Sequence, residues 1–276
     1  MNRKELRRSV MRELGDMRVL TATAAGTTTT LIDEANLYGE PGTYAGRLAY
    51  FSGGTAANLG LTRPVNGSSQ ADMAIIFSYA LPAATAVGDE AELVNTYGMG
   101  WTFEDVHSAI NSTIEEARSY GSVPVSEDIA VEFDEAGDRT VAIPDTFVGI
   151  NAVQYVDSVT GHPVNIRRAN VLGSNGWAVD HANREILING GQAYRAHEQV
   201  IRLYGYGDPA PLTDDDDETA LDPEWLHLKV CGRLLLNPMR SRQGQDVQGQ
   251  GLYYSDKADR LRARLTPLFG PSYVRL

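Results

Sequence analysis

The five histidines are the first residues of this chain that could do chemistry, as metal ligands or as acid–base groups. They are His107, His162, His181, His197 and His227. No two of them lie at a His-x-x-x-His spacing, and none stands beside a cysteine. A zinc site needs imidazole or thiolate ligands that converge at such spacings. The sequence therefore argues against a zinc site, and we expect neither a metal nor a cofactor.

Carboxylates are the next residues that could bind a metal ion or act in catalysis. The run from Asp214 to Glu218 has the charge to attract calcium, but it lacks the alternating ligands and the glycine of a calcium-binding loop. The pairs Glu104-Asp105 and Glu115-Glu116 are adjacent on the polar face of an amphipathic segment. Glycoside hydrolysis instead needs two carboxyl groups that converge on a cleft. We interpret the run as a solvated loop and the pairs as surface charges.

Motifs for nucleophiles and for phosphate binding are absent from the sequence. It contains no Gly-x-Ser-x-Gly, no Gly-x-Gly-x-x-Gly and no phosphate loop ending in Gly-Lys. The single cysteine, Cys231, lies in an apolar helical segment, where a thiol is ordinarily inert packing. We therefore expect a protein that is not an enzyme.

The elements that must position these side chains come from a chain of 276 residues, long enough for one large or two modest domains. Hydrophobic residues make up 42% and charged residues 22%, as in folded soluble proteins. The start, MNRKELRRSV, lacks the apolar run of a signal peptide, and no stretch approaches a membrane span. We expect a soluble, unexported protein.

The net charge of −12 is unevenly distributed. Residues 1–20 sum to +3, residues 21–207 to −13, residues 208–225 to −8 and residues 226–276 to +6. An acidic body argues against broad adhesion to nucleic acid or anionic membrane. The basic ends are rich in arginine, which pairs bidentately with carboxylates. This asymmetry suggests termini that dock on acidic partners or on neighbouring subunits.

Residues 1–121 are predicted to form an α+β region. Its first helix has Asn2 as N-cap with Glu5 three positions later, and Gly15 can end it. Residues 21–33 fit an extended segment, although the four threonines could also be a solvated loop. Strands are expected at 47–51 and 73–79, with a turn at 66–69 between them. The stretch AVGDEAELV is predicted to be a turn that leads into an edge strand.

An amphipathic helix is predicted at 103–120, with Thr102 as N-cap and Gly121 past its end. Residues 122–207 alternate in polarity, with turn signals every 8 to 12 residues or so, which is typical of an antiparallel sandwich or barrel. Residues 208–224 are expected to be an acidic linker.

Residues 225–276 are expected to hold helices and an arginine-rich loop. Asp222-Pro223 should begin a helix over 225–236. A mobile loop should follow, and Ser255 should cap a last helix. The predicted fold class is therefore α+β: an antiparallel β-sandwich or barrel domain flanked by helices from the N-terminal and C-terminal regions.

The order of these segments carries a resemblance. The pattern begins with the N-terminal stretch LRRSVMRELGDMRVLTATAAGTTTTLID. It continues with the segments TYAGRLAYFSGG, LTRPVNGSS, MAIIFSYALP, VGDEAELV and WTFEDVHSAINSTIEEA. A β domain ending in EQVIRLYGYG, the linker DDDDETALD, a helix and an Arg/Gln/Gly loop complete the pattern. This order resembles the head-to-tail connector, or adaptor, structural proteins of tailed bacteriophages, over most of the chain.

The resemblance implies a virion protein of the phage neck, assembled in the host cytoplasm. It would form a homo-oligomeric ring, expected to be dodecameric, that joins the portal protein to a tail or stopper protein. Double-stranded DNA would pass through without sequence-specific binding, and no membrane partner is implied. An acidic lumen suits this role because it repels phosphate. The candidate interface residues are those of the basic ends: Arg3, Arg7, Arg8, Arg12, Arg240, Arg242, Arg260, Arg262, Arg264 and Tyr273.

Two alternatives remain open from the sequence. The chain could be another neck or tail ring, such as a tail-completion or baseplate component. It could also be a carbohydrate-binding β-domain module for host attachment, which glycan binding or two carboxylates converging in a groove would favour.

Overall fold

The computed structural model describes residues 1–15, 17–38, 40–95, 101–119, 122–131, 140–156, 162–169, 176–189, 199–237, 245–265 and 274–275. The chain forms two compact units. Unit 1 consists of Met1–Ile114 and Pro211–Arg262, and unit 2 of Glu115–Ala210 and Ala263–Leu276. We expected residues 225–276 to form a region of their own. Most of that region instead completes the N-terminal unit, so unit 2 interrupts unit 1 in the sequence.

The fold class is α+β with antiparallel sheets, as predicted. The helices are α1 (Arg3–Leu14), α2 (Phe103–Ala117), α4 (Pro223–Leu235) and α5 (Gln245–Leu261), with 3-10 turns η1 (Ala56–Asn58) and η3 (Arg262–Arg264). Within the described ranges, none of these helices is both long and apolar enough to cross a membrane.

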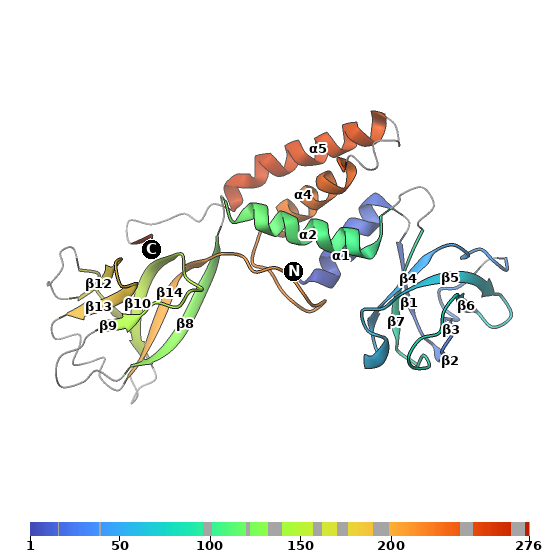
Figure 1. Ribbon diagram of the computed structural model, residues 1–276, viewed down its shortest axis with the longest axis horizontal. Helices are drawn as coiled ribbons and strands as arrows, with labels where there is room; N and C mark the ends of the chain where they lie inside the picture. The colour runs from blue at the N-terminus through green and yellow to red at the C-terminus, as the bar shows by residue number, and fades with distance from the viewer. Residues whose placement is uncertain are drawn as a thin grey trace. The chain divides into compact units, whose positions relative to one another are not determined.

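Unit 1 contains a seven-stranded antiparallel sheet (Figure 1). Its strands are β1 (Met17–Thr21), β2 (Ala24–Thr27), β3 (Thr30–Ile32), β4 (Leu48–Gly53), β5 (Thr62–Ser69), β6 (Ala74–Phe77) and β7 (Glu90–Val94). The order is β1-β7-β4-β5-β6-β3-β2. Only two residues separate β1 from β2, so the two ends of the sheet meet. The sheet thus curls around one apolar core that includes Leu20, Leu31, Phe51, Ile75 and Leu93.

Two expectations for this sheet were wrong. Residues 66–69 are not a turn but the end of β5, which bends at a register shift between Val65 and Gly67. The turn follows at 70–73, where Met73 has a φ of 46°. Strand β7 is not an edge, because it pairs with both β1 and β4. The threonine run is a hairpin: Thr27 ends β2, Thr30 starts β3, and the two threonines between them turn.

The sequence signals for three helices are confirmed. In α1 the Asn2 side chain accepts from the Glu5 N–H, and the Glu5 carboxylate accepts from the Asn2 N–H. Thr102 and Asp105 form the same reciprocal cap on α2. Asp222 caps α4 by accepting from the Trp225 N–H at 2.8 Å. Each cap satisfies backbone donors that the first helical turn leaves unpaired.

Helix α5 differs from the prediction. It begins at Gln245, so Ser255 lies inside the helix and does not cap it. One of the glycines that suggested a loop serves packing: a Cβ at Gly251 would lie 2.8 Å from Leu236. Likewise, a Cβ at Gly232 of α4 would lie 2.7 Å from the Ser255 hydroxyl. Glycine therefore allows α4 and α5 to approach closely, which offsets its low helix propensity. Figure 1 shows the two helices side by side.

Unit 2 confirms the predicted antiparallel β domain. One sheet has the order β11-β10-β14-β8 with β15 added at β10, and the other has the order β12-β13-β9. The strands are β8 (Val123–Val131), β9 (Thr140–Ala142), β10 (Gly149–Val156), β11 (Pro163–Ile166), β12 (Gly176–Asp180), β13 (Glu185–Asn189), β14 (Gln199–Gly207) and β15 (Val274–Arg275). Val153 and Leu203 from the first sheet and Trp177 and Ile186 from the second share one core. The unit is therefore two sheets packed on a common interior.

Candidate functional site

A cluster of charged side chains in unit 1 is the most distinctive local feature. Helix α1 buries Leu6, Val10 and Met11. Four of its five basic residues form two pairs spaced one helical turn apart, Arg3 with Arg7 and Lys4 with Arg8. Each of the four contacts a carboxylate of β7 or of residues 208–224. The helical repeat therefore brings four cations to one side of the helix.

Arg7 lies at the centre of this cluster and is completely buried. Its Nε and Nη2 donate to the two oxygens of Glu92, both at 2.7 Å. Its Nη1 and Nη2 donate to the two oxygens of Asp215, at 2.5 and 2.8 Å. Nη1 also lies 3.0 Å from Nε2 of His107. These contacts use all five N–H groups of the guanidinium.

Other charges surround the central pair. Glu92, also 0% exposed, accepts from Arg8 Nε at 2.8 Å. Glu90 accepts from Lys4 Nζ at 2.6 Å and from Arg8 Nη2 at 2.9 Å. Arg3 donates to Asp215 through Nε and Nη2. With four cations and three carboxylates, the buried charges are paired and hydrogen-bonded, which is the condition for tolerating them inside a protein.

The electrostatics follow from these contacts. Burial alone would lower the pKa of Arg7, but its hydrogen bonds to Glu92 and Asp215 outweigh burial and raise it. For Asp215 burial acts to raise the pKa, and the hydrogen bond and charge of Arg7 lower it overall. Burial, with the Arg7 charge second, lowers the pKa of His107 to about 4. His107 is therefore neutral at pH 7, so its Nε2 can accept from Arg7.

Tyr50 of β4 completes the cluster. The guanidinium carbon of Arg7 lies 4.3 Å from the centre of the Tyr50 ring, within range of a cation–π interaction. The Tyr50 hydroxyl donates to Asp215 at 3.3 Å. Burial raises the pKa of Tyr50, so the phenol stays protonated and keeps donating.

The expected acidic linker is in fact anchored to unit 1. The N–H groups of Arg3 and Lys4, which begin α1, donate to the carbonyls of Asp217 and Asp215 at 3.0 and 3.1 Å. Leu212 is buried and exchanges two hydrogen bonds with the Asn111 side chain of α2. The segment therefore supplies backbone acceptors to the start of α1, and it is a fixed part of the fold.

This anchoring sorts the acidic residues into two sets. Asp215 turns inward to Arg7, and Asp217 accepts from the N–H groups of Thr213 and Asp214 at 2.7 and 2.8 Å. The carboxylates between and beside them are exposed: Asp214, Asp216 and Glu218. We call these three residues the acidic edge. Their backbone is held in place, so the edge presents three exposed negative charges on an anchored segment.

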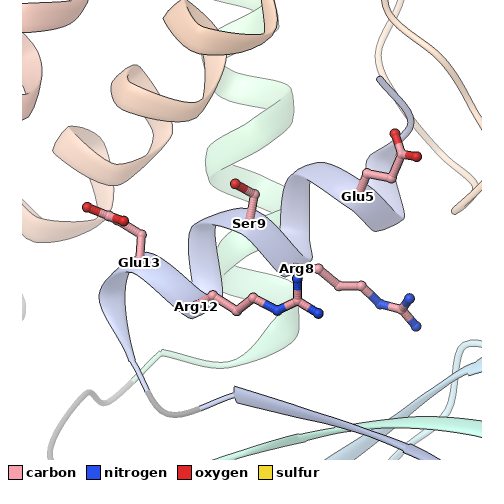
Figure 2. A pocket seen from close by; sticks show the side chains of 5 residues that line it. All are labelled: Glu5, Arg8, Ser9, Arg12 and Glu13. Carbon is pink, nitrogen blue, oxygen red and sulfur yellow. The ribbon is translucent and has the colours of Figure 1, made fainter.

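A shallow hollow of about 460 Å³ lies along the outer side of α1, lined by Glu5, Arg8, Ser9, Arg12 and Glu13. Figure 2 shows Glu5, Ser9 and Glu13 projecting to one side of the helix and the two arginines to the other. The hollow therefore mixes both charge signs, and its lining does not select anions or cations.

A serine–histidine pair lies beside this hollow. Ser9 Oγ is 2.9 Å from Nδ1 of His227 on α4, and Nε2 of His227 is 3.7 Å from Sγ of Cys231. Burial raises the pKa of Cys231 to about 12, so the thiol stays protonated and cannot orient the imidazole as a carboxylate would. Ser9 also lies inside α1, where helical hydrogen bonds engage the neighbouring N–H groups that an oxyanion would need. The contact joins two packed helices.

The structure places the predicted interface residues in different settings. Arg7 is buried, so it has no surface to offer a partner, and Arg3 and Arg8 are bound to carboxylates of their own chain. Arg12 is exposed at the hollow. Arg260, Arg262 and Arg264 are also exposed, and Arg260 pairs with Asp256. Arg240, Arg242 and Tyr273 lie outside the described residues.

Sequence reasoning missed the acidic partners in this cluster. Glu92 stands between the buried apolar residues Ala91 and Leu93 in the strand EAELV, and a carboxylate buried in such a strand must find a cation. That signal was present in the sequence but did not identify the partner. Asp215 and His107 carried no comparable signal, because the sequence placed one in an acidic run and the other on an amphipathic helix. Across the described parts of the chain, no three His, Cys, Asp or Glu side chains are grouped as metal ligands.

Comparisons with known proteins do not place the chain in a family. No protein-family model and no curated protein matches it. Among solved structures, a regulatory subunit of a cAMP-independent protein kinase A from Trypanosoma cruzi, bound to guanosine, matches over 93% of this chain and 92% of that chain. The identity is 10% and the TM-score 0.19, so the match carries no argument about fold or function.

Proposed function

We propose that this chain is a virion structural protein of a tailed bacteriophage, a head-to-tail adaptor that forms a ring at the neck and lets DNA pass. The order of its segments, which resembles that of connector proteins, motivates the proposal. The acidic edge is the observation that carries it furthest. Negative charges on an anchored segment would keep repelling the phosphates of passing DNA, whereas a mobile acidic tail can be pushed aside.

The buried cluster has a supporting role in this proposal. Arg3 and Arg7 hold Asp215 from inside, and the neighbouring Asp214 and Asp216 face outward as a result. The basic N-terminus therefore neutralises part of its own acidic segment, and docking on the portal is left to exposed residues such as Arg12. In a ring the acidic edge is repeated once per copy, so even weak repulsion by one edge adds up around the lumen.

Co-assembly with the portal tests the proposal directly. The full chain is mixed with the portal protein, the mass of the mixture is measured by light scattering, and the mixture and intact virions are imaged by cryo-electron microscopy. We expect rings of this chain beneath the portal and density for it in the neck. A chain that stays monomeric beside the portal and is absent from the virion would overturn the proposal.

Neutralising the acidic edge tests its role in DNA passage. We expect the triple variant Asp214→Asn/Asp216→Asn/Glu218→Gln to assemble normally but to slow DNA ejection and retain duplex DNA roughly tenfold more tightly at low salt. The difference should shrink near 0.15 M salt, where the screening length is about 8 Å. A matched control, Glu34→Gln/Glu40→Gln/Asp72→Asn, removes three exposed charges elsewhere in unit 1. Equal DNA retention by the two triple variants would contradict a specific role for the edge.

A further inference from the structure

Helix α5 leaves one face uncovered. It packs on α4 through residues such as Gly251 and Ala258, which are buried. On its other side two large side chains are mostly exposed, Tyr253 at 61% and Leu252 at 62%. A Cβ at Gly249, one turn before Tyr253, would touch nothing. This face therefore combines exposed apolar surface with space for close approach.

The charges at the two ends of this face, Asp246 and Arg260, are equally far from Tyr253 in the sequence. Asp246 lies seven residues before it and Arg260 seven residues after it, two helical turns in each direction. Gln250 and Asp256 lie three residues before and three residues after it. All of these side chains are exposed. The stripe thus runs from a negative end to a positive end, with an aromatic side chain at its midpoint.

We propose that a second copy of this chain docks on this stripe, with the two α5 helices antiparallel about a two-fold axis through Tyr253. Asp246 of each copy then faces Arg260 of the other, and Gln250 faces Asp256, while the two Tyr253 rings meet on the axis. The helix dipoles also oppose each other in this arrangement, which is favourable. A parallel pair would instead place Asp246 against Asp246 and Arg260 against Arg260.

The existing ion pair of the stripe is compatible with this docking. Arg260 Nη2 lies 2.6 Å from Asp256 of its own chain, but both side chains are mostly exposed. Exposed ion pairs at this spacing contribute at most about 0.5 kcal/mol, so Arg260 can turn to a partner at little cost. One pair of 17-residue helices buries less surface than a standard interface. The association is therefore weak, with a dissociation constant of roughly 10 to 100 μM.

Sedimentation of the full chain tests this contact in solution, without portal or virion. Between about 1 μM and about 1 mM we expect the mean mass to rise from 30.0 kDa toward twice that value. Asp246→Arg and Arg260→Asp should each weaken association at least tenfold or so, because each brings like charges together twice across the axis. The double variant Asp246→Arg/Arg260→Asp should restore it.

The rescue is diagnostic because, of the two single variants and the double variant, the double variant destabilises the α5 helix itself the most. It places a positive charge at the helix start and a negative charge at its end, against the helix dipole. Recovery of dimerisation can therefore come only from the contact between copies. A chain that stays at monomer mass throughout the range, or a double variant no better than the single variants, would overturn the proposal.

Cross-linking locates the axis even if the chain also forms larger assemblies. A residue on a two-fold axis meets its own copy, so Tyr253→Cys should form an intermolecular disulfide under mild oxidation, whereas the native Cys231 is buried. Tyr79→Cys, at a position 69% exposed in unit 1, is the matched control for random collision. Equal cross-linking of the two variants would exclude the axis at Tyr253. That result would leave the neck-ring proposal untouched, because the ring is tested by portal binding and imaging.

Discussion

Replacing Arg7 by Met is expected to destabilise unit 1 by about 3 to 5 kcal/mol, the usual cost of breaking a buried ion pair. Met fills a similar volume but leaves the fully buried Glu92 with only Arg8 as a cationic partner. Asp215 also loses its two inner hydrogen bonds, which loosens the anchored acidic segment. The cost arises mainly from the carboxylates left behind, since the methionine itself is compatible with burial.

Two companion variants separate charge from packing. Arg7→Lys keeps the charge but cannot bridge two carboxylates bidentately, so its loss of stability should be intermediate. Arg7→Met/Glu92→Gln removes the stranded charge and should be more stable than Arg7→Met alone.

Hydrogen exchange measured by mass spectrometry is the appropriate assay for these variants because it reports on each unit separately. Protection should fall in α1, β7 and residues 211–221, while unit 2 serves as the internal reference. Arg7→Met with stability of unit 1 within about 1 kcal/mol of the natural chain would show that the cluster does not hold the unit together.

Acidification is expected to weaken unit 1 before the carboxylates titrate. His107 has a pKa near 6.5 when unfolded and about 4 in the fold, where burial and the neighbouring Arg7 oppose its protonation. The unfolded chain therefore binds more protons than the native chain across this interval. The contribution of neutral His107 is fully present above about pH 6.5 and is lost as the pH falls toward 4, for a total of about 2 kcal/mol after allowance for its partial exposure.

Other groups of unit 1 add to this acid sensitivity. Burial lowers the pKa of His227, which acts in the same direction. The pKa of Glu90 is lowered mainly by its hydrogen bond to Lys4, and the net shift of Asp215 is also downward, so their contributions are lost at still lower pH. The steepest decline of stability should therefore begin below about pH 6.5 and continue through the carboxylate range.

His107→Gln isolates the contribution of one imidazole. The Gln carbonyl can still accept from Arg7 but does not titrate, so the slope of unfolding free energy against pH between about 4 and 6.5 should flatten. His181→Gln, at an exposed turn position of unit 2, should leave the slope of unit 1 unchanged. A His107→Gln protein with the same slope as the natural chain would assign the acid sensitivity to other groups. The measurement is denaturant unfolding at several pH values, with hydrogen exchange assigning each transition to its unit.

The sequence by itself determined the elements that depend on neighbouring residues. The caps of α1, α2 and α4 need partners only three positions apart, and these helices formed where predicted. The alternating polarity of residues 122–207 likewise predicted an antiparallel β domain, because a period of two reflects the geometry of a single strand.

Where longer-range packing competes with local signals, sequence reasoning failed. The Gly/Gln-rich segment around residue 250 has low helix propensity, yet it is helical because Gly251 and Gly232 let α5 pack closely on α4. The acidic segment looked like a linker because nothing near it in sequence could neutralise it. Its partners, Arg3 and Arg7, stand more than 200 residues earlier.

The candidate site was likewise decided only by tertiary structure. Arg7 and Glu92 are 85 residues apart, and no spacing rule connects a helix position to a strand position across that distance. The basic N-terminus suggested a surface that binds other proteins. In the fold, however, Arg7 is buried and pairs with Glu92 and Asp215 of its own chain. Composition and local pattern determine which charges a chain carries and which helices and strands it forms. The pairing of those charges depends on which elements pack together, because the desolvation cost of a buried charge must be offset by a partner at close range.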